Sequence, residues 1–304
     1  MATVMATVMA TVMAMVMATA MVTAANMVMV TTRTKTIKRR REDISHRMMD
    51  FTLKKYHELL VALQNKDYTT MTFEEYLQET RPKRFVILRH DVDKKPKNSL
   101  AAARVEASLG MKSSYYFRAV PKSWDEVIIK EIASLGHEIG YHYESLATCN
   151  GNITAALHDF EINLNKLREM APVATICMHG SPRSKYDNRQ LWESKSYHDF
   201  GIIGEPYFDI DFSQVFYLTD TGRRWDGFKV SVRDKIPVHQ ERWCSEGLVF
   251  HSTDNIISAV NEDRLPNHIM MTTHPQRWND RIIPWTNELV MQRTKNIMKK
   301  LLIG

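Results

Sequence analysis

The chain has 304 residues, of which 44% are hydrophobic and 25% charged, so it can bury a sizeable core without disulfides or structural metals. Its three cysteines, Cys149, Cys177 and Cys244, are too scattered for a disulfide framework or a paired-cysteine metal site, which favours a reducing compartment. The net charge is +6. Six of the 41 Lys and Arg residues lie before position 42 and no Asp or Glu does, so residues 42–304 have a net charge of zero. A nucleic-acid-binding surface is therefore not expected in the folded part.

Residues 1–41 differ in composition from the rest of the chain. Met-Ala-Thr-Val is repeated three times at the start, and no charge precedes Arg33. We expect a low-complexity, basic-ended and disordered extension followed by one domain, residues 42–304. The uncharged run is long enough for a membrane anchor, but its many threonines and lack of leading basic residues fit a secretory signal poorly. We expect a cytoplasmic protein, with membrane contact only if residues 1–32 insert.

Hydrophobic periodicity predicts helices first and then an alternation of strands and helices. Helices are expected at 44–65, 72–77, 97–109, 124–135, 152–170 and 284–302, and strands at 85–89, 114–117, 137–141, 173–178, 201–204, 214–218, 228–232 and 268–273. Such alternation indicates an α/β protein with a parallel sheet, either closed as a barrel or open and doubly wound. No Gly-x-Gly-x-x-Gly or Walker-type loop follows a predicted strand, which argues against nucleotide binding.

Four predicted strands end at a histidine, and the first also ends at two carboxylates. These strand-end residues are His90, Asp91 and Asp93; His142, with Glu144 beside it; His179; and His274. One such histidine is more often structural, and Asp-x-Asp alone is more often a turn. Together, however, they would meet at one edge of a parallel sheet.

Such a set suits a divalent metal, above all zinc, held by one Asp and two His with a position open for water. The metal would activate the water, an uncoordinated carboxylate would take its proton, and a histidine opposite would protonate the leaving group. We expect a loop to aim Asp91 and Asp93 into the same pocket, one as base and one as ligand.

Three segments resemble the motifs of a known family. Residues 84–275 resemble the polysaccharide deacetylases, metal-dependent carbohydrate esterases, through Asp91-Val92-Asp93, through Gly136 to His142, and through Thr272-Thr-His274-Pro. The resemblance implies a distorted (β/α) barrel in which Asp91 is the general base, Asp93 and His142 bind the metal, and His274 is the general acid. It leaves His137 a structural role, and it is nearest to a divergent branch found among bacterial surface-polysaccharide genes.

The chain departs from that family at two positions. The second motif of the family has a further metal-binding His four residues after His142, where this chain has Leu146. The family's third motif begins with an Arg that orients the base, where this chain reads Met178-His179. Either His179 replaces the missing ligand, or Glu144 does, or the metal is lost.

Several residues outside these motifs are of types that bind sugars. Trp225 and Trp278 could stack on sugar rings or belong to the core. Arg223 or Arg224 could hold an acidic sugar or pair with Asp220. These four residues and Arg183 form the candidate substrate-binding set.

The function expected from the sequence is hydrolysis of an acyl group, typically acetyl, from an amino sugar or polysaccharide precursor. A carbohydrate is then the expected partner, and surface-polysaccharide metabolism the expected context. Two alternatives remain open: a catalytically inactive glycan-binding or assembly protein of the same fold, motivated by Leu146, and a metal-dependent amidase acting on a small non-sugar C–N bond.

Overall fold

The computed structural model describes residues 49–78, 80–181, 184–225 and 235–303, with side chains as far as 297. The chain divides into two units, Met1–Met49 and Asp50–Gly304, and the described strands and helices belong to the second. The predicted extension and the strand expected at 228–232 lie outside the described residues. Within the described part, no helix combines the length and the apolar character needed to cross a membrane.

A seven-stranded sheet forms the centre of the fold, and every strand pair in it is parallel. The strands are β1 (Thr69–Met71), β2 (Phe85–Val92), β3 (Ser114–Phe117), β4 (Glu138–Tyr143), β5 (Ile176–Met178), β6 (Phe216–Thr219) and β7 (His268–Thr273). Their order is β5-β4-β3-β2-β7-β6, with β1 pairing the first half of β2. This confirms the predicted α/β class and its parallel sheet.

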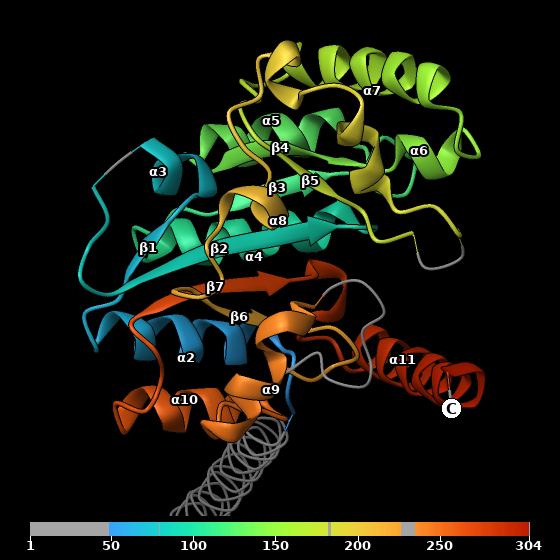
Figure 1. The fold of residues 1–304 in the computed structure, drawn as a ribbon. Helices are drawn as coiled ribbons and strands as arrows, with labels where there is room; N and C mark the ends of the chain where they lie inside the picture. The colour runs from blue at the N-terminus through green and yellow to red at the C-terminus, as the bar shows by residue number, and fades with distance from the viewer. Residues whose placement is uncertain (1–48, 79, 182–183, 226–234, 304) are drawn as a thin grey trace, which may run out of the picture. The chain divides into compact units, whose positions relative to one another are not determined.

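Helices connect the strands and cover the sheet (Figure 1). They are α2 (Leu53–Gln64), α3 (Phe73–Gln78), α4 (Pro96–Ser108), α5 (Glu126–Ser134), α6 (Ser145–Thr148), α7 (Ile153–Arg168), α8 (Pro206–Asp209), α9 (Pro237–Ser245), α10 (Thr253–Asn261) and α11 (Ile282–Ile303), with short 3-10 helices η1 (Asn188–Glu193), η2 (Tyr197–Phe200) and η3 (Pro275–Arg277). Local signals set several ends. Thr52 caps α2 by accepting from the Lys55 amide at 3.0 Å. Gly136, at φ +88°, allows the reversal from α5 into β4.

The sheet is a curled half-barrel rather than a closed barrel. From β2 the chain continues in order through β3 and β4 to β5, while β6 and β7 return to the other edge of β2. Among the described strands, no pairing joins β5 to β6, and only the isolated bridge between Thr175 and Gly204 extends from the β5 side. The strand predicted at 201–204 is reduced to this bridge, in which the Ile203 amide donates to the Ala174 carbonyl and the Gly204 carbonyl accepts from the Ile176 amide. Gly201 adopts a left-handed conformation (φ +69°) at the end of η2, so the extended pairing cannot begin there.

The two faces of the sheet have different surroundings. All eight residues of β2 are buried, and they alternate between the faces as a strand requires. His90 points towards α4, where its Nε2 lies 2.6 Å from the Glu106 carboxylate. Arg89 and Asp91 point to the inner face of the half-barrel. The carboxyl ends of the strands therefore present one set of side chains to the interior and another to the helices.

Candidate metal centre and active site

Asp91 is fixed by an arginine of its own strand. Arg89 lies two residues earlier, hence on the same face, and binds the carboxylate in bidentate fashion, with Nε–Oδ1 and Nη2–Oδ2 distances of 2.8 and 2.6 Å. Both side chains are almost completely buried. The predicted loop that would aim Asp91 inward is unnecessary, because β2 continues to Val92 and residues two apart on a strand share a face.

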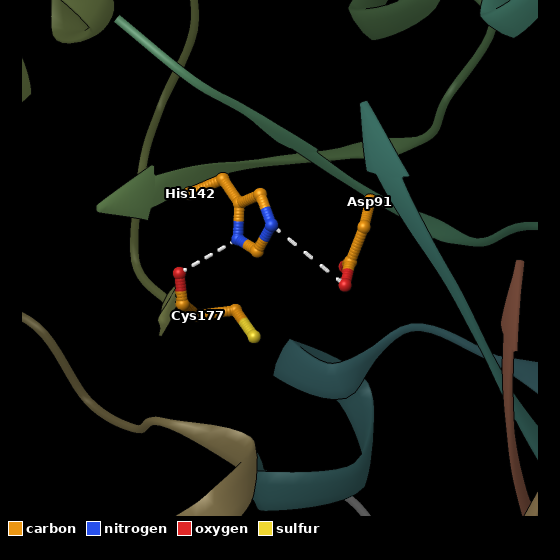
Figure 2. Close-up of side chains that lie close together, drawn as sticks. All are labelled: Asp91, His142 and Cys177. Atoms are coloured by element: carbon orange, nitrogen blue, oxygen red, sulfur yellow. Dashed lines mark hydrogen bonds and ion pairs between the residues drawn. The ribbon is translucent and has the colours of Figure 1, made fainter. Parts of the chain in front are cut away.

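His142, near the end of β4, lies between a backbone carbonyl and the carboxylates of the first motif. Its Nδ1 lies 2.9 Å from the carbonyl oxygen of Cys177, which can only accept, so Nδ1 carries the proton and Nε2 has the lone pair when the ring is neutral. Figure 2 shows Nε2 turned towards Asp91, whose Oδ2 is 3.8 Å away. Burial lowers the pKa of His142 to about 4, so the ring is neutral near pH 7.

Asp93 has one engaged oxygen and one orphaned oxygen. Gln276 of η3 donates from Nε2 to Oδ2 at 3.0 Å. Oδ1 is buried and accepts no hydrogen bond, yet it lies 3.9 Å from His142 Nε2 and 3.5 Å from His179 Nε2. Burial raises the pKa of Asp93, but the surrounding His179, His274 and His142 outweigh it and hold the pKa well below its usual range.

His179 follows β5 and reaches the same carboxylate, Asp93. Its Nδ1 lies 2.8 Å from Glu144 Oε2, so its Nε2 is directed at Asp93. The ring meets that of His142 edge-on, with centroids 5.2 Å apart. Leu146, where the sequence resemblance would have a further ligand, is buried in the hydrophobic cluster beneath α6 and α7.

His274, directly after β7, is held by Asp220. The Asp220 carboxylate accepts from the His274 amide at 3.0 Å and from its Nδ1 at 2.7 Å, and also from Trp278 Nε1 at 2.9 Å and from Arg277. Burial and Arg277 lower the pKa of His274, but Asp220 and Asp93 together outweigh them and the net pKa is raised. The other ring nitrogen, Nε2, is thereby left to act on a ligand, and Asp93 is close enough that each group shifts the pKa of the other.

The donors around Asp93 Oδ1 match the spacing of a zinc site in part. Ligand atoms of tetrahedral zinc lie roughly 3.4 Å apart, close to the separations of Asp93 Oδ1 from each of the two imidazole Nε2 atoms, but the three ligand atoms do not all lie within 4.8 Å of one another, so one ring would have to turn to close on an ion. An unsatisfied buried carboxylate oxygen facing two imidazole nitrogens is also costly unless a cation or water lies between them. Asp93 and His179 are 24% and 15% exposed, so this group has an open side.

A second grouping shares His142 but suits a catalytic ion less well. Asp91, His142 and Cys177 each place one ligand atom within 4.8 Å of the others, the one group of three among the described residues that meets this spacing (Figure 2). All three are buried, which leaves no open position. Moreover, Asp91 Oδ2 already accepts from the Arg89 guanidinium, which would repel a cation there. Asp93, His142 and His179 are therefore the candidate group for a catalytic ion.

Two histidines of the sequence motifs lie outside the centre. His90 belongs to the helix-facing side of β2, as the strand period requires. His137 contacts the Ala103 carbonyl at 3.0 Å and the Ser113 hydroxyl at 3.1 Å, in the structural role expected for it.

The predicted substrate-binding set does not gather around the centre. Trp225 and Trp278 are 0% and 2% exposed and pack with Phe51, so the expectation that their rings stack on a sugar is wrong in this structure. The Arg223 guanidinium donates to the carbonyls of Arg277 and Asp50 and packs over Phe51, and its hydrogen bond with Asp220 is a backbone one, from the Arg223 amide to the Asp220 carbonyl at 3.0 Å.

The last two members of the set are placed differently. Arg224 Nη2 lies 2.7 Å from His251 Nδ1, away from the metal-binding group. Arg183 lies outside the described residues.

Four functional partners were missed by the sequence analysis: Arg89, Arg118, Asp220 and Gln276. Arg89 carried a usable signal, since an arginine within an apolar strand two residues before Asp91 must share its face and needs a counter-charge. Arg118 follows β3, so its strand-end position was a weaker signal. Asp220 and Gln276 lie beyond the ends of β6 and β7 and had no local signature.

Fold and site together define a parallel α/β protein with a carboxylate–histidine centre at the carboxyl edge of its sheet. No protein-family profile matches the chain, and no curated protein matches it. Among solved structures, it is similar to BA3943, a CE4 family pseudoenzyme from Bacillus anthracis, and to a BA3943 mutant with restored enzymatic activity, each with 11% identity, a TM-score of 0.37 and 73% of this chain covered. The chain spans slightly less than two thirds of those proteins, 65% of the mutant and 63% of the wild type. At this level of similarity the site geometry, not the comparison, carries the functional argument.

Proposed function

We propose that the protein is a metal-dependent hydrolase of the polysaccharide deacetylase type, which removes an acetyl or related acyl group from an amino sugar or polysaccharide precursor. The observation that carries the proposal is the orphaned Oδ1 of Asp93, buried between the lone-pair nitrogens of His142 and His179. Asp91 and His274 accompany this centre, each held by a charged partner of its own.

Asp93, His142 and His179 would hold a zinc ion, which supplies Lewis-acid chemistry when bound, acidifying a water and polarising the acyl carbonyl. Asp91, oriented by Arg89, accepts a proton from the attacking water as the water oxygen bonds to the acyl carbon. His274 donates a proton from Nε2 to the leaving amine nitrogen as the C–N bond breaks. The products are a free amine and a carboxylic acid.

The proposal separates the roles of the two aspartates. Asp93→Ala removes a ligand and should abolish zinc uptake, measured as metal content after dialysis, whereas the wild type should retain about one zinc ion per chain. Asp91→Asn should retain the metal and lose about 10²–10⁴-fold in turnover on acetylated amino-sugar oligomers.

A matched control is Asp199→Asn, an exposed aspartate of η2, which should change neither quantity. A wild-type chain that holds no zinc and acquires none on addition would remove the mechanism. Turnover of small amides without turnover of acetylated sugars would select the amidase alternative.

One observation favours a second candidate, a glycan-binding protein of this fold without hydrolytic activity. Leu146 is buried in the core, so the position expected for the third ligand cannot contribute a donor. If His179 does not replace that ligand, the fold retains the polar side chains at the carboxyl ends of its strands but binds no metal. Saturable glycan binding that survives chelation, with no turnover in the metal-loaded chain, would select this candidate.

A further inference from the structure

We infer that Arg118 and Glu144 form a positioning pair that fixes the orientation and tautomer of His179, and so compensates for the ligand lost at Leu146. The inference rests on the proposed function, because it takes His179 to be a zinc ligand. The orientation and tautomer of His179 can be measured without metal. Arg118 follows β3 and Glu144 follows β4, so the pair links two strand ends to a third, that of β5.

The contact between Arg118 and Glu144 is a fork that leaves Glu144 no freedom to turn. Arg118 donates from Nε to Oε1 at 3.0 Å, and from Nη2 to Oε1 and Oε2 at 2.7 and 2.9 Å. Such bidentate pairs fix the relative orientation of the two side chains as well as holding them together. Both side chains are largely buried, 20% and 16% exposed, unlike an ordinary surface pair such as Arg104–Glu131 at 61% and 37%.

Glu144 then dictates which nitrogen of His179 carries the proton. Its Oε2 lies 2.8 Å from His179 Nδ1, and a carboxylate can only accept, so the proton of a neutral ring is on Nδ1. The Nε2 lone pair is thereby directed at Asp93 Oδ1, 3.5 Å away. An imidazole that donates its other N–H to a carboxylate is also the arrangement that orients histidine ligands in metal sites.

The backbone of His179 is fixed as firmly as its ring. Its amide donates to the Tyr143 carbonyl at 2.8 Å, and its carbonyl accepts from Asn188 Nδ2 at 2.7 Å. The remaining freedom of the residue is rotation of the ring, which Glu144 restrains together with the Ser181 hydroxyl, 3.1 Å from Nδ1. Without Glu144, the ring could turn or adopt the other tautomer while the fold stayed intact.

The test uses Glu144→Leu in the full chain, which keeps the size of the side chain and removes the acceptor. In the metal-free protein, ¹⁵N NMR of histidine should show the Nδ1–H form of His179 in the wild type and a shift towards Nε2–H in the variant, with His179→Gln assigning the signal. Zinc affinity, measured by competition with a chelator, should fall about 10–100-fold. The thermal midpoint should change little.

Arg118→Met provides a second variant in case Glu144→Leu folds poorly, and it should weaken zinc binding less, because the acceptor remains. Arg118→Lys should restore part of the loss, since it keeps the charge but not the fork. Glu131→Leu, which breaks the exposed pair with Arg104, is the control and should change neither the tautomer nor the affinity.

An unchanged His179 signal in Glu144→Leu would overturn the inference, as would a wild type in which Nδ1 is unprotonated. These outcomes are distinct from failure of the proposed function. If the wild type binds no zinc, the hydrolase proposal fails, while the tautomer measurement still decides whether Arg118 and Glu144 position His179.

Discussion

At the scale of single residues, the site depends on the partners that orient each functional group. His274 shows this most clearly, because opposing effects act on the same ring. Burial and Arg277 lower the pKa of His274, whereas Asp220, in contact with Nδ1 at 2.7 Å, and Asp93 raise it, and the net shift is upward. A general acid must be protonated to act, so the raised pKa extends activity to higher pH.

Removing the Asp220 charge should therefore shift the alkaline limit of activity. Asp220→Asn leaves the lowering effects of burial and Arg277 on the His274 pKa opposed only by Asp93, so the alkaline limb of kcat/KM should move to lower pH. The measurement is a pH profile of kcat/KM, which reports the free enzyme.

Two comparisons make this prediction specific. His274→Gln should lower kcat/KM by about 10²–10⁴-fold and remove the dependence on this group. The acidic limb should stay in place in Asp220→Asn if that limb belongs to another group. An alkaline limb that does not move, or moves upward, would contradict the role of Asp220.

At the scale of elements, one buried carboxylate joins α4 to the strands behind the site. Glu106 of α4 accepts from Ser113 Oγ at 2.6 Å and Tyr115 OH at 2.9 Å, and it also bonds His90 Nε2 at 2.6 Å and the Tyr56 hydroxyl of α2. Burial raises the pKa of Glu106, but His90 and the other partners outweigh it, and the pKa falls to about 2.

This network should make part of the stability sensitive to acid. Because the pKa of Glu106 is lower in the folded chain than its ordinary value of about 4.3, its contribution is full above that value and is lost as the pH falls towards 2. Glu106→Gln should cost about 3 kcal/mol at pH 6 and flatten the acid slope. Urea unfolding between pH 2.5 and 6 measures both.

Glu161→Gln, at an exposed position of α7, is the matched control and should leave the curve unchanged. If Glu106→Gln keeps the wild-type dependence on acid, other carboxylates are responsible for it.

At the scale of the whole molecule, the elements were easier to predict than their arrangement. Strands such as 85–92 and 114–117 are short apolar runs, and such patterns depend on local sequence. The placement of β7 beside β2 depends on contacts between residues far apart in the chain, as does the opening between β5 and β6.

The same division applies to the site. The sequence located Asp91, Asp93, His142 and His179, because parallel strands bring their carboxyl ends to one edge. It could not predict that Asp220 holds His274, which depends on long-range pairing. It also could not decide whether Trp225 is core or surface, because a tryptophan suits both environments.

The half-barrel gives its strands unequal protection from solvent. β2 is hydrogen-bonded along both edges, by β7 on one side and by β1 and β3 on the other. β5 and β6 each have one paired edge formed by a named strand, and β5 is only three residues long. Edge strands open at a smaller free-energy cost than central ones, since fewer hydrogen bonds must break.

Amide hydrogen exchange should therefore divide the sheet into a slow centre and faster edges. Peptides from β2 and β7 should exchange slowest, and peptides from β5 and β6 faster by on the order of tenfold or more. Mass spectrometry of the full chain resolves these peptides, and β3, also paired on both edges, serves as the internal reference for central strands. Equal protection of β5, β6 and β2 would mean that the edges are paired in solution and the barrel is closed, which would contradict an open half-barrel.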